Sequence, residues 1–254
     1  KVDDKKDYMQ GAYLGPRYSN EEIKKYLDEK GCVYKKLTDD ELPEKIADLV
    51  SEQKVIGWFQ GRMEFGPRAL GGRSILGDPR SEQMQKTLNL KVKYRESFRP
   101  FAPSVLREDV TDWFELNHDS PYMLLVGNVK GDKRIKMTAE EESLFGIEKL
   151  NIKRSGIPAV THVDYSARIQ TVHKKTNPKY HALITKFKEK TGCSVVVNTS
   201  FNVRGEPVVC SPEDAFKCFM GTELDLLVIG NCVLKKDEQD SSLTEDYKGR
   251  YELD

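Results

Sequence analysis

Apolar residues follow two different periods along the 254-residue chain, and segments of the two kinds alternate. A period of three to four residues predicts helices, whereas short apolar runs predict buried strands. The predicted helices are residues 21–30, 38–50, 81–91, 110–116, 179–192 and a helix that begins at Ser211. The predicted strands are residues 32–37, 55–59, 122–126, 159–163, 168–172, 194–197 and 226–233, and a strand stiffened by proline is predicted to start at Arg99. This alternation predicts an α/β or α+β fold.

Capping residues mark two of the helix starts. Ser19 stands before residues 21–30, which end at Gly31, and Ser211 stands before Pro212. A serine before a helix accepts a hydrogen bond from a backbone N–H group of the first turn. Proline at the first helical position costs no hydrogen bond, because the N–H group that it lacks would have no partner within the helix. The sequence therefore predicts that Ser19 and Ser211 mark the starts of these two helices.

Residues 57–101 break the alternation, because arginine and glycine gather there without a helical apolar period. Residues 61–107 hold ten Lys or Arg against four Asp or Glu, although the whole chain has a formal net charge of zero. Arg62, Arg68 and Arg73 each follow glycine or proline and are expected on loops, where guanidinium groups and backbone N–H groups bind phosphate or carboxylate. The pattern favours an anion site, and the alternative is a solvated basic face paired with acids elsewhere.

Two cations and three short polar residues extend this hypothesis. Lys93 and Arg99 lie six residues apart, where both could reach one polyphosphate, although two ordinary surface cations would give the same spacing. Asn198, Ser200 and Asn202 follow a buried strand at its carboxyl end, where ligands of open α/β sheets bind. These three could bind phosphate or ribose oxygens, or they could equally be turn residues that bond their own backbone.

A third cluster lies in the sequence THVDYSARIQTV. Strand alternation would place His162 and Asp164 on the face opposite Thr161, and Arg168 follows shortly after. Polar residues in a buried strand often face a ligand, so His162 and Arg168 are candidate ligand residues. The alternative is a structural hydrogen bond between His162 and Asp164.

Composition and missing motifs exclude several function classes. The five cysteines have no CxxC spacing and the four histidines are not spaced as a metal set, so neither a disulfide framework nor a metal site is predicted. GxxxxGK[ST], GxGxxG after a strand, GxSxG and HExxH are all missing. No apolar run approaches the roughly 20 residues that span a bilayer, so a cytoplasmic protein without a membrane anchor is expected. A pI near 7.1 argues against a protein that coats nucleic acid.

Two segments are expected to lie outside the core. Residues 130–155 are polar and charged, which predicts a surface insertion. Residues 235–254 hold four positive and seven negative charges with few large apolar residues. Such a composition predicts a flexible tail.

Several long motifs resemble one known enzyme family. These are GWFQGRMEFGPRALGGRSIL, the DPR that follows, YRESFRPFAPSVL, NTSFNVRGEPVV and SPEDA. Together they are similar to the C-terminal region of the carbamoyltransferases that include nodulation protein U, the cephalosporin-type enzymes and the tobramycin carbamoyltransferase. The resemblance covers about residues 14–234, less clearly at 130–155, and leaves residues 1–13 as a linker.

The resemblance implies a YrdC/Sua5-like fold, a twisted mixed sheet with flanking helices. Such a domain makes carbamoyl adenylate from ATP, Mg²⁺ and carbamoyl phosphate. An N-terminal Kae1-like domain, which holds Fe²⁺ or a similar ion, then transfers the carbamoyl group. This chain lacks that domain, and its start at Lys1 without Met fits a fragment.

The resemblance also implies roles for individual residues. Lys93, Arg99 and Ser200 would be catalytic, and no metal ligand is expected in this chain. The substrate-binding residues would be Arg168, Asn198, Arg68, Arg73, His162 and Asn202. Of these, Arg68 and Arg73 could instead face the missing domain.

Other readings stay open beside this one. An RNA-binding YrdC-like module is one alternative, although the neutral charge counts against nucleic acid. A catalytically silent scaffold that docks the transferase domain is another, and a homodimer is also possible. The final carbamoyl acceptor would be bound by the absent domain, so its identity is not readable here.

Overall fold

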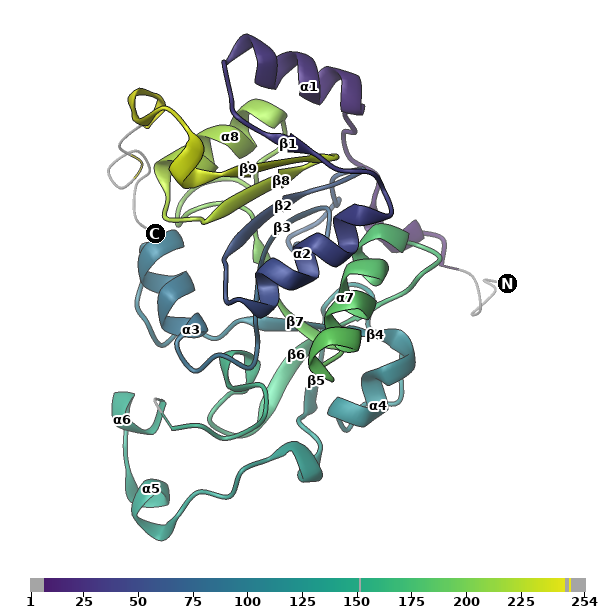
Figure 1. Cartoon of the computed structure of the whole chain (residues 1–254). Helices are drawn as coiled ribbons and strands as arrows, with labels where there is room; N and C mark the ends of the chain where they lie inside the picture. Colours follow the sequence, from purple (N-terminus) through teal and green to yellow (C-terminus); the bar gives the residue numbers. More distant parts are fainter. Residues whose placement is uncertain (1–6, 151, 245–246, 248–254) are drawn as a thin grey trace.

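Within residues 7–150, 152–244 and 247, which the computed structural model describes, nine strands form one mixed sheet. Their order is β1-β9-β8-β2-β3-β7-β4-β6-β5. The pairs β2 with β8 and β4 with β6 are parallel, and the other neighbours are antiparallel. The sheet twists, and α2 and α7 pack side by side over one face while α8 packs against β8 and β2 (Figure 1). The predicted α/β class, with a mixed sheet and flanking helices, is confirmed.

The strands are β1 Lys35–Lys36, β2 Ile56–Phe59, β3 Arg73–Gly77, β4 Ala102–Leu106, β5 Leu125–Asn128, β6 Ser166–Val172, β7 Val195–Ser200, β8 Leu226–Ile229 and β9 Cys232–Lys235. The helices are α1 Asn20–Glu29, α2 Glu41–Ser51, α3 Met84–Thr87, α4 Val110–Trp113, α5 Ala139–Ser143, α6 Ile147–Leu150, α7 Pro178–Thr191 and α8 Pro212–Gly221. A π-helical segment, Leu88–Val92, continues α3. In the described part of the chain, no helix is long and apolar enough to cross a membrane.

The core explains why β7 is central. Val195, Val196 and Val197 are fully buried, and β-branched side chains fit a strand that is covered on both faces. β7 pairs with β3 on one side and β4 on the other. Its polar end, Asn198–Ser200 in sequence, is therefore held in the middle of the sheet.

Most predicted helices form as expected. Ser19 and Ser211 each accept a bond from the third helical residue, and both complete a capping box. The helices predicted over residues 38–50 and 179–192 are α2 and α7, and α7 ends at Gly192 in the left-handed conformation. Local patterns were sufficient for these elements.

Three strand predictions are wrong in detail. Residues 159–163 form no strand, because Pro158–Val160 is a 3₁₀ turn and Tyr165 has φ of 66° before β6 begins. Residues 226–233 are two strands, since the chain reverses at Gly230, whose φ is 54°. The strand predicted over residues 122–126 begins only at Leu125, and β3 was not predicted at all.

The two segments predicted to lie outside the core differ in their contacts. Residues 130–155 carry α5 and α6 on an arm that extends away from the sheet (Figure 1). In the C-terminal segment, Gln239 bonds Val33, and Tyr247 is buried. In the N-terminal segment Ala12 is buried, and residues 1–6, 245–246 and 248–254 lie outside the described residues.

Candidate functional site

A cavity of about 300 Å³ opens at the polar end of β7. It is lined by four arginines and by no Asp or Glu. The lining residues are Pro67, Arg68, Ala69, Arg95, Arg99, Pro100, Phe101, Ala102, Met123, Arg168, Asn198, Thr199 and Ser200. We call it the arginine cavity. Positive charge without a carboxylate partner in its lining indicates an anion site.

The sheet brings these residues together from distant parts of the chain. Ala102 at the start of β4 pairs with Asn198, and Ser200 pairs with Ser74 of β3. Arg168 enters on β6, which pairs with β4 on its other side. The cavity therefore lies where the carboxyl end of β7 meets the amino end of β4.

The positive charges of Arg68 and Arg168 repel each other in this cavity. Burial and the like charge of Arg68 lower the pKa of Arg168 below its usual value. Neither guanidinium forms an ion pair in the described chain, and the Nε atoms of both are buried without a hydrogen-bond partner there. Arg168 Nη2 lies only 4.0 Å from Met123 Sδ. An oxyanion between the two arginines would satisfy donors that the protein leaves open.

The other two arginines come from the loop after the π-helical segment. Arg99 pairs with Glu96 through a 3.1 Å contact, and half of each side chain remains exposed. Arg95 donates from Nε to Asn89 Oδ1 over 2.7 Å, and its guanidinium carbon lies 5.1 Å from the centre of the Phe101 ring. Burial and the charge of Arg99 lower the pKa of Arg95 to about 10. These contacts hold the Arg95 guanidinium at the cavity wall.

Arg95 is the lining arginine that the sequence analysis missed. Its sequence signal was the segment KYR, in which Arg95 follows Lys93 by two residues. The fully buried Asn89 adds the missing reason, because its Nδ2 donates to the carbonyl oxygens of Ser97 and Arg99. The Asn89 side chain thus holds the loop of residues 95–99 at both of its ends.

Lys93 lies behind the cavity wall and does not line it. Its Nζ donates to the carbonyl oxygens of Ser200 and Asn202 over 2.5 and 2.8 Å, and to Asn202 Oδ1 over 2.7 Å. Ser200 Oγ is 3.3 Å away. Burial lowers the pKa of Lys93 to about 7, although the charge of Glu206 and these oxygens favour the ammonium form. Lys93 therefore places a titratable charge directly behind Ser200.

Two of the predicted polar ligands serve mainly the fold. Asn198 Nδ2 donates to Ala69 O, Ser104 Oγ and Gln170 Oε1, while its buried Oδ1 has no partner within the described residues. Asn202 accepts from Ser200 Oγ over 2.6 Å and donates to Glu206 O. Asn198 lines the cavity, whereas Asn202 lies outside it with Lys93.

Arg73 is placed under the loop and away from the arginine cavity. It is completely buried, and its Nη atoms donate to the carbonyl oxygens of Pro16, Gln60, Gly61 and Gly72. Its guanidinium carbon lies 3.5 Å above the Phe59 ring centre. This geometry favours a structural role, and binding of substrate by Arg73 stays a sequence-based prediction.

The backbone N–H groups of this loop are also occupied. The buried Glu64 carboxylate accepts hydrogen bonds from the N–H groups of Leu70, Gly72 and Arg73. The protein's own carboxylate thus fills the backbone anion nest that the glycines form. Of the loop arginines, Arg68 is left to face the arginine cavity.

His162 is not brought to the arginine cavity. Its backbone N–H donates to Ser166 O in the turn before β6. Burial lowers the pKa of its imidazole, with Arg168 and Arg154 acting in the same direction and Asp164 opposing them. A direct ligand contact by His162 stays a prediction.

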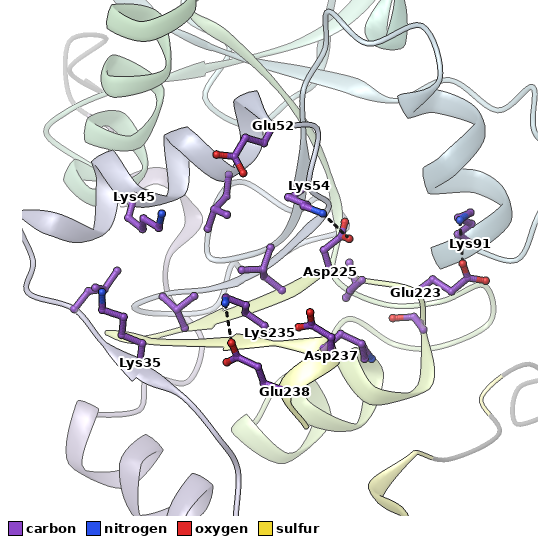
Figure 2. Close-up of a pocket in the computed structure, with 17 residues that line it drawn as sticks. Lys35, Lys45, Glu52, Lys54, Lys91, Glu223, Asp225, Lys235, Asp237 and Glu238 are labelled. Carbon is purple, nitrogen blue, oxygen red and sulfur yellow. Dashed lines mark hydrogen bonds and ion pairs between the residues drawn. The ribbon is translucent and has the colours of Figure 1, made fainter. Parts of the chain in front are cut away.

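A larger hollow lies elsewhere, between α2 and the β8–β9 hairpin, with a volume of about 860 Å³. Figure 2 shows that its lysines alternate with carboxylates. Lys54 pairs with Asp225, Lys91 with Glu223 and Lys235 with Glu238. Because these charges compensate one another, the smaller arginine cavity is the stronger anion site.

Comparisons with known proteins identify the family of this chain. A family model described as Carbamoyltransferase C-terminus matches residues 47–236. The protein sll1178 of Synechocystis sp. is 59% identical in an alignment that covers 96% of this chain and 41% of that protein. Nodulation protein NolO of Bradyrhizobium diazoefficiens is 43% identical, covering 78% of this chain and 33% of NolO.

An O-carbamoyltransferase is also similar. The 3'-hydroxymethylcephem-O-carbamoyltransferase of Streptomyces clavuligerus is 34% identical over 73% of this chain and 31% of that enzyme. The chain therefore spans less than half the length of these relatives. Because the family model covers most of the chain and includes every residue that lines the arginine cavity, this protein belongs to the carbamoyltransferase C-terminal family.

Proposed function

We propose that this chain binds ATP and carbamoyl phosphate in the arginine cavity and forms carbamoyl adenylate for a transferase domain. The observation that carries the proposal is the cluster of four guanidinium groups without a lining carboxylate. Arginine binds phosphate oxygens through two parallel N–H groups, and burial strengthens such contacts. The carbamoyltransferase relatives are longer than this chain, which leaves room for the transferase domain outside it.

The chemistry needs positioning more than a protein nucleophile. Water would first hydrolyse carbamoyl phosphate to carbamate and free phosphate. Attack of a carbamate oxygen on the α-phosphate of ATP would then form carbamoyl adenylate and expel pyrophosphate, and the charge on the phosphate oxygens must be neutralised. Arg68 and Arg168, whose Nε donors are open, would bind one phosphate group, and Arg95 and Arg99 another. Ser200 lines the cavity, with its Oγ 3.3 Å from Lys93 Nζ, and its hydroxyl group would orient a substrate oxygen.

Magnesium does not have a protein-built site in this cavity. Mg²⁺ prefers carboxylate and water oxygens, and no Asp or Glu lines the arginine cavity. Within the described residues, no group of three or more His, Cys, Asp and Glu could hold a metal ion. Magnesium would therefore enter as the counter-ion of ATP.

Arg99→Ala is expected to weaken Mg-ATP binding by about 1–3 kcal/mol, the usual loss of a charge-assisted hydrogen bond. Calorimetric titration with and without carbamoyl phosphate measures this. The control is Arg107→Ala, because Arg107 also pairs with a carboxylate but lies beyond the opposite end of β4.

The outcomes separate the candidate functions. Weaker binding in Arg99→Ala with parental binding in Arg107→Ala supports the cavity as the nucleotide site. If the parent binds neither ligand, the adenylation proposal fails and a docking scaffold becomes the better function. Salt-sensitive retention of RNA in place of ATP would favour the RNA-binding alternative.

Raising the pH from 7 to 9 is expected to weaken ATP binding, because Lys93 loses its positive charge above a pKa of about 7. The unfolded chain would keep that proton up to the usual value of 10.5, so the contribution of Lys93 to folding stability rises over the same interval. Affinity and stability should therefore change in opposite directions. Titrations and urea unfolding at both pH values measure this, and affinity that is constant from pH 7 to 9 would contradict a charged role for Lys93.

A further inference from the structure

A buried carboxylate lies near Lys93 and is held by the C-terminal segment. Glu206 is only 8% exposed, in the turn that follows β7. Val203 N–H donates to its Oε2 over 2.8 Å, and the Tyr247 hydroxyl donates to its Oε1 over 2.5 Å. Both carboxylate oxygens are thus fixed, one of them by a residue from the segment expected to be a flexible tail.

Tyr247 occupies a specific seat. Its side chain is 3% exposed, and its ring lies against Gly221, the last residue of α8. A Cβ atom built on Gly221 would lie 2.4 Å from the ring carbon Cδ2 of Tyr247. Glycine at this position therefore makes the space in which the tyrosine packs.

Hydrogen bonds connect this seat to the back of the arginine cavity. Asn202 Nδ2 donates to Glu206 O over 2.6 Å, and Asn202 Oδ1 accepts from both Lys93 and Ser200. The chain of contacts runs from Tyr247 through Glu206 and Asn202 to Lys93. Every link in it is shorter than 3 Å.

Charges from three elements act on Lys93. Burial acts most strongly and opposes the ammonium form of Lys93, as Arg95 also does, whereas the buried Cys218 of α8 and Glu206 favour it. Glu206 is the only carboxylate among these groups. Its distance from Lys93 depends on the donors that hold its two oxygens.

We infer that Tyr247 is a positioning residue for the arginine cavity: through Glu206 it fixes the turn of residues 200–202 around the Lys93 ammonium group. The role of Tyr247 in ligand binding rests on the proposed function, whereas its contacts do not depend on that function. Tyr247→Phe keeps the ring in its seat and removes only the hydroxyl. Glu206 then loses one anchor, and its favourable charge acts less on Lys93.

The test is the ionisation of Lys93, followed by NMR in the whole chain with isotope-labelled lysine. The Lys93 signal is identified by its loss in Lys93→Arg. The expected Lys93 pKa in Tyr247→Phe is lower than in the parent by about half a unit. The matched control is Tyr34→Phe, because Tyr34 also donates to a carboxylate, Asp28, at a site on α1.

Glu206→Gln shows whether the effect passes through the carboxylate. Glu206→Gln should lower the Lys93 pKa by at least as much as Tyr247→Phe, and the double variant should match Glu206→Gln. An unchanged Lys93 pKa in Tyr247→Phe, or in Glu206→Gln, overturns the inference. Additive shifts in the double variant overturn it as well, since Tyr247 would then act by another route.

Titration with Mg-ATP separates this inference from the proposed function. The shift in Lys93 is expected to weaken Mg-ATP binding at pH 8 by about threefold in Tyr247→Phe, with no change in Tyr34→Phe. A parent chain that binds no ATP would overturn the proposed function and leave the NMR result standing. Unchanged ionisation in a parent that binds ATP would overturn only the role of Tyr247.

Discussion

Replacement of Arg73 with alanine is expected to lower the free energy of unfolding by about 3–5 kcal/mol, the range for removing one partner of a buried charged contact. The guanidinium bonds four carbonyl oxygens and covers the Phe59 ring. Alanine would remove the side-chain donor from the Gln60 and Gly61 oxygens and open a cavity beneath the loop. The Gly72 and Pro16 oxygens would keep one backbone N–H donor each. Urea unfolding monitored by circular dichroism measures the loss.

Arg62→Ala is the matched control, because Arg62 lies in the same loop but is exposed and, among the described residues, bonds only Gly15 O, over 3.1 Å. Its expected loss is within about 0.5 kcal/mol. A stable Arg73→Ala protein with impaired ATP binding would contradict the structural role and restore the ligand role that the sequence suggested.

Lys93→Met is expected to lower the free energy of unfolding by about 2–4 kcal/mol and to weaken Mg-ATP binding by about 1–3 kcal/mol. Methionine fills the space of the lysine chain but offers no donor to the Ser200 and Asn202 carbonyl oxygens. The turn loses its fixed shape, and the cavity loses a charge behind Ser200. Chemical unfolding and calorimetry on the same samples measure the two effects.

Lys91→Met controls for the removal of a lysine charge. Lys91 is two residues earlier, exposed, and paired with Glu223 over 3.2 Å at the surface. It should change neither quantity by more than about 0.5 kcal/mol. If Lys93→Met binds ATP like the parent, Lys93 only supports the turn and the predicted catalytic role fails.

The convergence of distant residues was partly predictable from the sequence. Charge patterning and the family resemblance led to Arg68, Arg99, Arg168, Asn198 and Ser200, and the structure brings all five to one cavity. Arg68 and Arg99 stand beside a proline and Ser200 ends β7, where the backbone itself limits the position of the side chain. Arg168 and Asn198 lie inside β6 and β7. The structure thus brings these residues together, and their roles as ligand residues stay predictions.

Burial could not be predicted for the same residue types. Arg73 follows a glycine as Arg68 follows a proline, yet Arg73 begins β3 and points under the loop. That outcome depends on carbonyl oxygens of residues 16 and 60–61, which only the folded sheet brings near. Arg95 was not predicted, because Asn89, which holds its guanidinium group at the cavity, lies in a π-helical segment that no sequence pattern indicates.

The place of β7 between β3 and β4 also has a kinetic consequence. The walls of the arginine cavity come from residues 67–69, 95–102, 168 and 198–200, so the cavity exists only after these remote segments have met. Closing such long loops is costly in chain entropy and tends to come late in folding. A phosphate ligand would then bind only the folded sheet. Its binding would lower the rate of unfolding and leave the rate of folding unchanged.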